Sequence, residues 1–142
     1  MNPETFTADL TRELQGHLDV CREFLALFTE ENHAFRRPQP WSPGEFNPQR
    51  KRLLQRLELV LIKLRSFRPW WERMPANERE SCGEIKTLFR DIQNLLPRVL
   101  LLDRENQQEM LRHGLIPATQ LPPAASQRPN FVANLYRRHA AV

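Results

Sequence analysis

The fold is decided by residues 85–113, which read IKTLFRDIQNLLPRVLLLDRENQQEMLRH. One stripe of positions in this stretch consists of Ile85, Leu88, Ile92, Leu95, Val99, Leu102, Asn106 and Met110. Its intervals of three and four residues are the heptad pattern of a helix that buries one side against other helices. Pro97 should bend this helix without ending it. Gly114 and Pro117 follow the stretch and are typical of a helix end.

Two earlier segments have the same spacing and are expected to cover this stripe. The first begins near Thr7, a suitable N-cap. Its stripe consists of Leu10, Leu14, Leu18, Cys21, Leu25, Phe28, Asn32 and Phe35. The second begins with Asn47 as N-cap and Pro48 at the first helical position, and Pro69 should kink or end it near Phe67. Its stripe consists of Leu53, Leu57, Val60, Leu64, Phe67 and Trp71.

Aromatic residues mark both connections between the predicted helices. Residues 36–47 are rich in proline, and Trp41 and Phe46 within them are expected to dock on the end of the bundle, with a ligand contact as the alternative. Trp70, Trp71 and Met74 form a hydrophobic group at the second connection. We expect it to be buried at the other end of the bundle, with a binding surface as the alternative.

Asn32 and Asn106 occupy stripe positions of the first and third helices. In an up-down-up arrangement these two helices run parallel, which places the two asparagines near the same end. We expect them to meet, directly or through a water molecule, and to fix the register of the helices. The alternative is that each faces a solvated edge of its stripe.

The composition limits the fold to one small helical domain. The chain has 142 residues, four glycines and one tyrosine, so a structure with many tight hairpins is unfavourable. It has no apolar run long enough for a membrane span, and its N-terminus lacks the order of a signal peptide, which predicts a cytoplasmic protein. Cys21 and Cys82 are expected to be reduced thiols. The sequence therefore predicts an all-α fold: an antiparallel three-helix bundle or long helical hairpin over residues 1–114, whose kinked third helix starts near Asn77 or Ser81.

The net charge of +4 is unevenly distributed. Residues 1–35 have a net charge of −5, residues 36–73 of +7 and residues 74–109 of −2. A basic helix between two acidic ones indicates ion pairs between neighbours in the bundle. A less favoured interpretation is a nucleic-acid surface. It would use Arg50, Lys51, Arg52, Arg56 and Lys63.

Residues 115–142 form a separate C-terminal part. Residues 115–129 contain four prolines and are expected to be an extended linker. The segment after them is amphipathic, with Asn130 as its cap, and is too short to be stable as an isolated helix. It either docks on its own bundle, swaps into a second copy, or folds on a partner. The candidate partner-binding residues are Phe131, Val132, Leu135, Tyr136, Arg137 and Arg138.

The sequence contains no recognisable catalytic or metal-binding motif. The four histidines are scattered, no Cys/His cluster is present, and no glycine-rich phosphate loop or nucleophile elbow occurs. We therefore expect a protein that is not an enzyme and has neither cofactor nor metal.

Three features resemble the FlgN-like flagellar export chaperones, over roughly residues 8–113. They are the long N-terminal heptad helix, the sequence Arg50-Lys51-Arg52-Leu53-Leu54, and the sequence Leu-Asp-Arg-Glu-Asn-Gln at residues 102–107. The resemblance implies a small cytosolic α-helical chaperone that binds helical termini of hook–filament junction proteins and delivers them to the type III export gate. It also implies that the C-terminal region takes part in binding. A self-associating structural bundle remains the alternative function.

Overall fold

The computed structural model describes residues 2–38, 44–112 and 131–140, and these residues form five α-helices and no strand. The helices are α1 (Pro3–Ala34), α2 (Asn47–Arg73), α3 (Ala76–Ser81), α4 (Gly83–Arg112) and α5 (Phe131–Ala140). The predicted all-α bundle is confirmed. None of the described helices combines the length and the apolar character that a membrane span requires.

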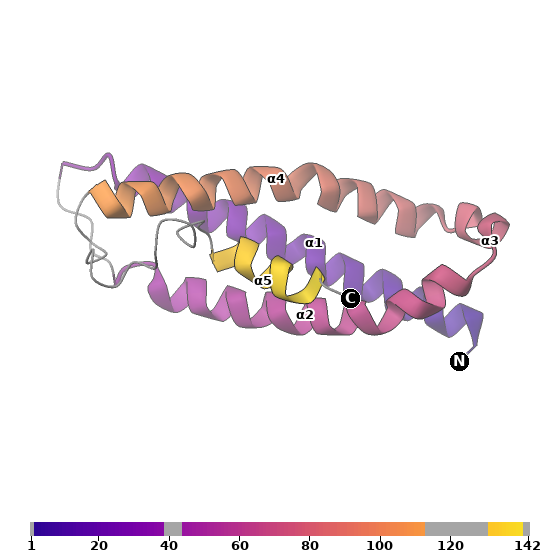
Figure 1. Ribbon diagram of the computed structural model, residues 1–142. Helices are drawn as coiled ribbons and strands as arrows, with labels where there is room; N and C mark the ends of the chain where they lie inside the picture. The colour runs from indigo at the N-terminus through magenta and orange to yellow at the C-terminus, as the bar shows by residue number, and fades with distance from the viewer. Residues whose placement is uncertain (1, 39–43, 113–130, 141–142) are drawn as a thin grey trace.

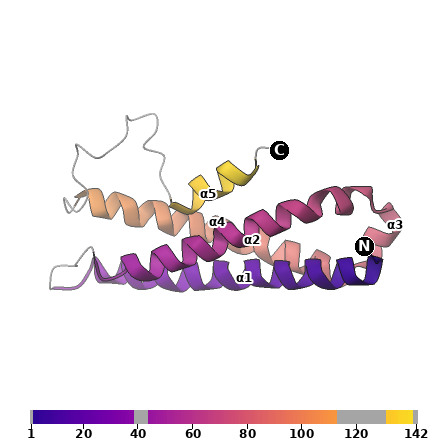
Figure 2. The same ribbon diagram turned by 90° about the horizontal axis from the view of Figure 1, so that it is seen from below.

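The three long helices run along one axis, and α1 is the central one (Figure 1). α2 and α4 both pack on α1 but scarcely on each other, and the short α3 connects them at one end. α5 lies beside α2 and α4 over only part of their length, as two perpendicular views show (Figures 1 and 2). The bundle therefore has three helices side by side along its length, and α5 adds a fourth helix along one half.

The core consists of two hydrophobic clusters, one in each half of the bundle. The cluster on the α3 side joins α1 and α4; its buried residues are Phe6, Leu10, Leu14, Leu18, Ile85, Leu88 and Ile92. The cluster on the other side includes α5; its buried residues are Val20, Phe24, Leu27, Phe28, Ala34, Phe46, Leu53, Leu57, Val99, Met110, Val132 and Leu135. Leu95 is half-buried and packs against both.

The stripe that was predicted for residues 85–113 lies in this core. Six of its eight positions are buried, whereas Leu95 and Leu102 are half-buried. Asn32 and Asn106 meet as predicted, since Asn32 Nδ2 donates to Asn106 Oδ1 at 3.0 Å. Asn106 Nδ2 in turn donates to the backbone carbonyl of Phe28 at 2.9 Å. α4 continues through Pro97 as a single helix.

The predicted helix starts need correction. α1 begins at Pro3, not near Thr7, because Asn2 accepts a hydrogen bond from the Glu4 N–H at 3.0 Å and Pro3 suits the first turn. α2 begins at Asn47 itself, so this residue is not the N-cap. The predicted third helix is divided at Cys82 into α3, which begins at Ala76 without a side-chain cap, and α4, which begins at Gly83.

Of the two alternatives predicted for Pro69, a kink or an end of α2 near Phe67, the structure excludes the end. The helix contains Pro69 and continues to Arg73, because Phe67, Trp71 and Met74 pack against the cluster on the α3 side and hold this last turn. Trp71 stacks at a tilt on Phe89 of α4, with ring centroids 5.9 Å apart. Trp70, in contrast, is 46% exposed and does not share in the burial that was expected for this group.

Phe46 is buried in the core, as expected for a residue that anchors the first connection. Cys21 and Cys82 are both free thiols. The predictions for Trp41, for the helix-ending residues Gly114 and Pro117, for the linker of residues 115–129 and for the Asn130 cap lie outside the described residues.

Candidate functional site

The candidate site is the groove between α2 and α4, whose floor is α1. We call it the α5 groove, because α5 occupies one half of it (Figure 1). Of the placements that the sequence allowed for the C-terminal segment, the structure shows docking on the chain's own bundle. The expectation that this segment stands free to grip a partner is therefore wrong for residues 131–140: docking removes its apolar side chains from water.

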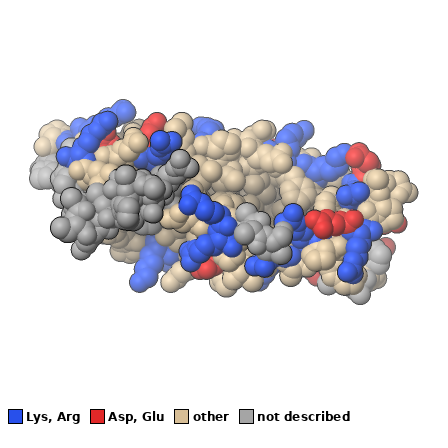
Figure 3. Space-filling model, viewed as in Figure 1, with Lys and Arg blue, Asp and Glu red and all other residues tan. Residues whose placement is uncertain are grey.

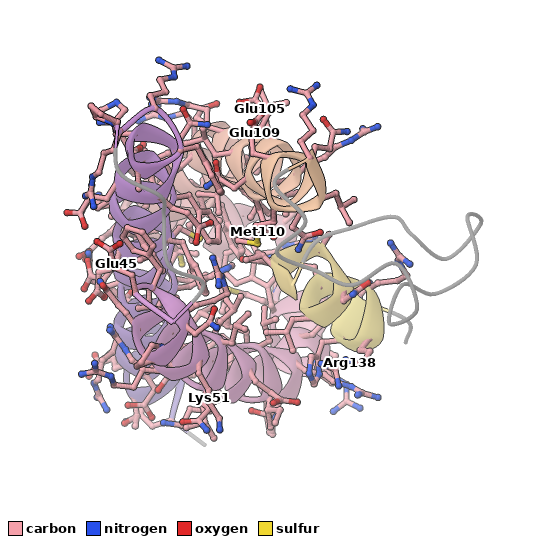
Figure 4. The ribbon with its side chains drawn as sticks, turned by 90° about the vertical axis from the view of Figure 1, so that its left-hand side faces the viewer. Glu45, Lys51, Glu105, Glu109, Met110 and Arg138 are labelled. Atoms are coloured by element: carbon pink, nitrogen blue, oxygen red, sulfur yellow. The ribbon has the colours of Figure 1, made fainter. Side chains whose placement is uncertain are left out.

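The predicted partner-binding residues divide into two groups. Val132 and Leu135 are 1% and 4% exposed and belong to the core, where the half-buried Leu54, Leu61 and Leu100 also pack. Arg137 and Arg138 remain exposed, and Arg138 points away from the bundle in Figure 4, whereas Met110 of α4 points inward. The side chain of Phe131 lies outside the described residues.

Asp103 of α4 receives the N-terminal end of α5. Its Oδ2 accepts a hydrogen bond from the backbone N–H of Val132 at 3.2 Å, so a residue from another helix does the work of a cap. The carboxyl group is 2% exposed. Burial raises its pKa to about 7; the Val132 hydrogen bond and the charge of Arg50 oppose that shift, and the charge of Glu31 adds to it. Docking of α5 thus encloses a carboxyl group that titrates near neutral pH.

Tyr136 contacts the floor of the groove through its hydroxyl group. Tyr136 Oη hydrogen-bonds with His17 Nε2 and lies 3.7 Å from Cys21 Sγ. Burial lowers the pKa of His17 to about 4, so this imidazole is neutral at physiological pH. Burial also raises the pKa values of the Tyr136 hydroxyl and the Cys21 thiol, so neither ionises readily. The three side chains therefore join α5 to α1 as neutral groups, and they do not form an activated nucleophile.

A buried ion pair lies in the same half of the bundle. Glu31 of α1 pairs with Arg50 of α2, and their side chains are 1% and 5% exposed. Arg50 Nη1 also donates to Asn47 Oδ1 at 2.7 Å. Burial raises the pKa of Glu31, although the charge and hydrogen bond of Arg50 oppose that shift. Together with Asn106 and Asp103, this pair makes one end of the bundle core polar.

The α5 groove continues beyond α5 toward α3. His17, which contacts Tyr136, also lines a pocket of about 330 Å³. The other residues that line it are Leu10, Leu14, Leu64, Phe67, Arg68, Trp71, Phe89, Ile92 and Gln93. Most of them are apolar, and they come from α1, α2 and α4. A helix longer than α5 could therefore lie in both halves of the groove.

Five residues of this site were not predicted from the sequence: Glu31, Arg50, Asp103, His17 and Cys21. A signal was present for three of them. Glu31 lies three residues after Phe28, Arg50 three before Leu53, and Asp103 four after Val99, so each charged residue occupies a position on a buried side of its helix. Charged residues at such positions indicate a polar core contact. No local pattern connects His17 or Cys21 with Tyr136, because more than 100 residues separate them.

Three of the five residues proposed for nucleic-acid binding are paired with acidic residues of α1, whereas Lys51 and Arg52 are exposed. Arg50 is buried against Glu31. Arg56 pairs with Glu23 at 2.6 Å and Lys63 with Glu13 at 3.7 Å, both across the interface of α2 with α1. These two pairs confirm the predicted charge pairing between neighbouring helices. The described residues contain no group of three or more His, Cys, Asp or Glu side chains that could hold a metal ion.

Comparisons of the chain with protein-family models, with curated proteins and with solved structures give no significant match.

Proposed function

We propose that this chain is a non-enzymatic binding protein whose α5 groove takes up an amphipathic helix of another protein. The observation that supports the proposal is α5 itself, an amphipathic helix of ten residues that fits the groove. A helix of this length has little stability of its own, so its docking depends on a few contacts of Val132, Leu135 and Tyr136. A longer helix would gain the same contacts and the pocket beyond His17.

In this proposal α5 competes with the partner and does not grip it. The apparent affinity for the partner is then reduced by the fraction of molecules in which α5 is docked. The partner helix should present small and medium-sized apolar residues in the manner of Val132 and Leu135, and further apolar residues toward Phe67 and Trp71.

The resemblance to FlgN-like chaperones suggests which proteins to try first. We propose that the occupant is a helical terminus of a hook–filament junction protein and that the chain acts as a cytosolic export chaperone or adaptor. The neutral contacts of Tyr136 and the mostly apolar pocket support a chaperone that must later release its cargo, since these contacts contain no buried charge pair across the interface.

The experiment measures binding of a labelled peptide, the C-terminal helix of such a junction protein, by fluorescence anisotropy. Leu135→Asp places a charge in the contact between α5 and the bundle and should release α5. If α5 competes for the groove, this variant binds the peptide about tenfold more tightly or better. If α5 itself grips the partner, the same variant loses binding, and the competition is refuted.

A second pair of variants tests the groove. Leu100→Asp alters a half-buried residue of α4 that packs against the core cluster containing Val132 and Leu135, and this variant should abolish peptide binding. Leu101→Asp alters the next residue, which is 58% exposed, and should leave binding unchanged. Equal effects of the two variants would exclude the groove as the binding site. Gel filtration of Leu135→Asp tests the alternative, in which α5 is exchanged between two copies and a dimer depends on it.

A further inference from the structure

The outer side of α2, opposite the groove and α1, has an exposed apolar stripe. Leu59, Ile62 and Trp70 are 60%, 50% and 46% exposed. At 3.6 residues per turn they fall on one side of the helix, roughly opposite the fully buried Leu57. α2 is the lowest helix in Figure 1, and Figure 2 looks onto this side of it. We call these three residues the α2 outer stripe.

Basic residues surround the α2 outer stripe. Lys51, Arg52, Arg65 and Arg73 are exposed, and none forms a hydrogen bond or ion pair with another described residue. Figure 4 shows Lys51 pointing away from the bundle, and Figure 3 shows more Lys and Arg than Asp and Glu along the α2 edge. The surroundings of the stripe are therefore positively charged.

The two acidic residues of α2 offset only part of this positive charge. Glu58 lies one turn before Ile62 and borders the stripe, but its Oε1 is directed to α5, 3.5 Å from His139 Nε2. Glu72 pairs with Arg68, one of the residues that line the groove, at 3.0 Å. What covers the α2 outer stripe should therefore be both apolar and negatively charged.

This combination argues against three possible occupants. A second copy of the chain would bring the same cations face to face, which repel. A nucleic acid would be attracted by the cations, but it would gain nothing from exposed Leu59 and Ile62 side chains. A protein partner is usually anchored in pockets, whereas this surface is the outside of one helix. An anionic bilayer accepts a helix that lies flat, with aliphatic side chains and a tryptophan at the headgroup level and with basic residues beside them.

From these observations we propose that the α2 outer stripe and its flanking cations bind the surface of a membrane that contains anionic lipids. The chain would lie on the bilayer with α2 downward, and the α5 groove would stay accessible from the side. This binding is independent of the helix-binding function proposed above, because the two surfaces occupy different sides of α2.

The test is co-sedimentation of the full chain with vesicles of phosphatidylcholine alone or mixed with phosphatidylserine. We expect binding only to the mixed vesicles, with a loss of affinity as salt is added. Leu59→Gln with Ile62→Gln should reduce the partition coefficient about tenfold or more. Lys51→Gln with Arg52→Gln should have a similar effect. Circular dichroism checks that each variant remains helical.

Matched control variants come from α4. Leu101→Gln changes an equally exposed leucine, and Arg98→Gln with Arg104→Gln removes two exposed cations. Neither control should change the partition coefficient. Tryptophan fluorescence distinguishes Trp70 from Trp71. The emission should shift to shorter wavelength when the protein binds vesicles, and this shift should be lost in Trp70→Phe and kept in Trp71→Phe, since Trp71 is half-buried.

Three results would overturn the proposal. The first is equal binding to neutral vesicles, and the second is an equal loss in the α4 controls. The third is binding to polyglutamate or to RNA at low salt without binding to anionic vesicles, which would assign the surface to an acidic macromolecule. Loss of peptide binding in the groove assays would not affect these measurements.

Discussion

Replacing Arg50 by methionine should destabilise the protein far more than the same change at Arg56. Both arginines belong to α2, and both pair with a glutamate of α1. Arg50 and Glu31 are 5% and 1% exposed, whereas Arg56 and Glu23 are 48% and 47% exposed. Removing one partner of a buried pair leaves a buried charge and costs about 3–5 kcal/mol. An exposed pair contributes about 0–1 kcal/mol.

The cost of Arg50→Met should also depend on pH. Without the guanidinium, Glu31 and Asp103 share a buried site, and their pKa values, already raised by burial, should rise further. A carboxyl group whose pKa is raised in the folded state binds its proton more tightly there than in the unfolded chain. The free energy of unfolding of the variant therefore falls as the pH rises from the unfolded pKa values, near 4, through the folded ones. The deficit relative to the parent should be larger at pH 8 than at pH 5.

Urea denaturation followed by circular dichroism at both pH values measures these quantities. Because the free energy of unfolding of a small domain is only about 5–15 kcal/mol, the destabilisation by Arg50→Met should clearly lower the urea concentration at the midpoint of unfolding. The double variant Glu31→Leu with Arg50→Met removes both charges of the pair and should recover much of it. If Arg50→Met costs no more than Arg56→Met, or if its cost is the same at both pH values, the argument from the buried pair is refuted.

Three further predictions concern the same half of the molecule. Asp103→Asn should stabilise the protein at pH 8 but hardly at pH 4, because the folded pKa of about 7 lies above the unfolded value of 3.8. Denaturation curves of parent and variant at each pH measure this, and an equal difference between the two proteins at both pH values would contradict it. Asn106→Leu should cost about 1–3 kcal/mol, because it removes the hydrogen bond to the Phe28 carbonyl and leaves Asn32 Nδ2 without its acceptor; thermal unfolding should show the loss, and a variant as stable as the parent would mean that the asparagine pair adds nothing. With a thiol reagent at pH 8, Cys82 should react quickly and the buried Cys21 slowly. Tyr136→Phe removes the hydroxyl group near Cys21 and loosens α5, so it should accelerate the labelling of Cys21 alone. An unchanged labelling rate would show that the hydroxyl group does not hold α5.

The bundle itself could be predicted from the sequence because it depends on spacing. Heptad stripes fix which side of each long helix is buried, and proline and glycine clusters fix where the chain turns. The asparagine contact followed from the same reasoning, since the seam positions and the parallel course of α1 and α4 place Asn32 beside Asn106. The boundary errors at Thr7 and Pro69 arose where a stronger local cap, or packing of the last turn, outweighed the local signal.

The candidate site was largely beyond sequence analysis for a different reason. The pattern in residues 131–140 predicted an apolar side but not the surface that it packs against. That surface is formed by residues of α1, α2 and α4. The energy of docking depends on Asp103, His17 and Cys21, whose roles exist only after the bundle has formed. Single charged residues on a helix are usually solvated, whereas Glu31 is buried and Arg50 compensates its charge.

The division of the core into two clusters has a consequence for cooperativity. Leu95 is the half-buried residue that packs against both, so one end of the bundle could open while the other retains its structure. Native-state amide exchange would then fall into two classes, one for residues around Leu14 and Ile92 and one for residues around Val99 and Phe28. Such a molecule could open the half of the bundle that holds α5 to admit a partner helix, while the half next to α3 stays folded.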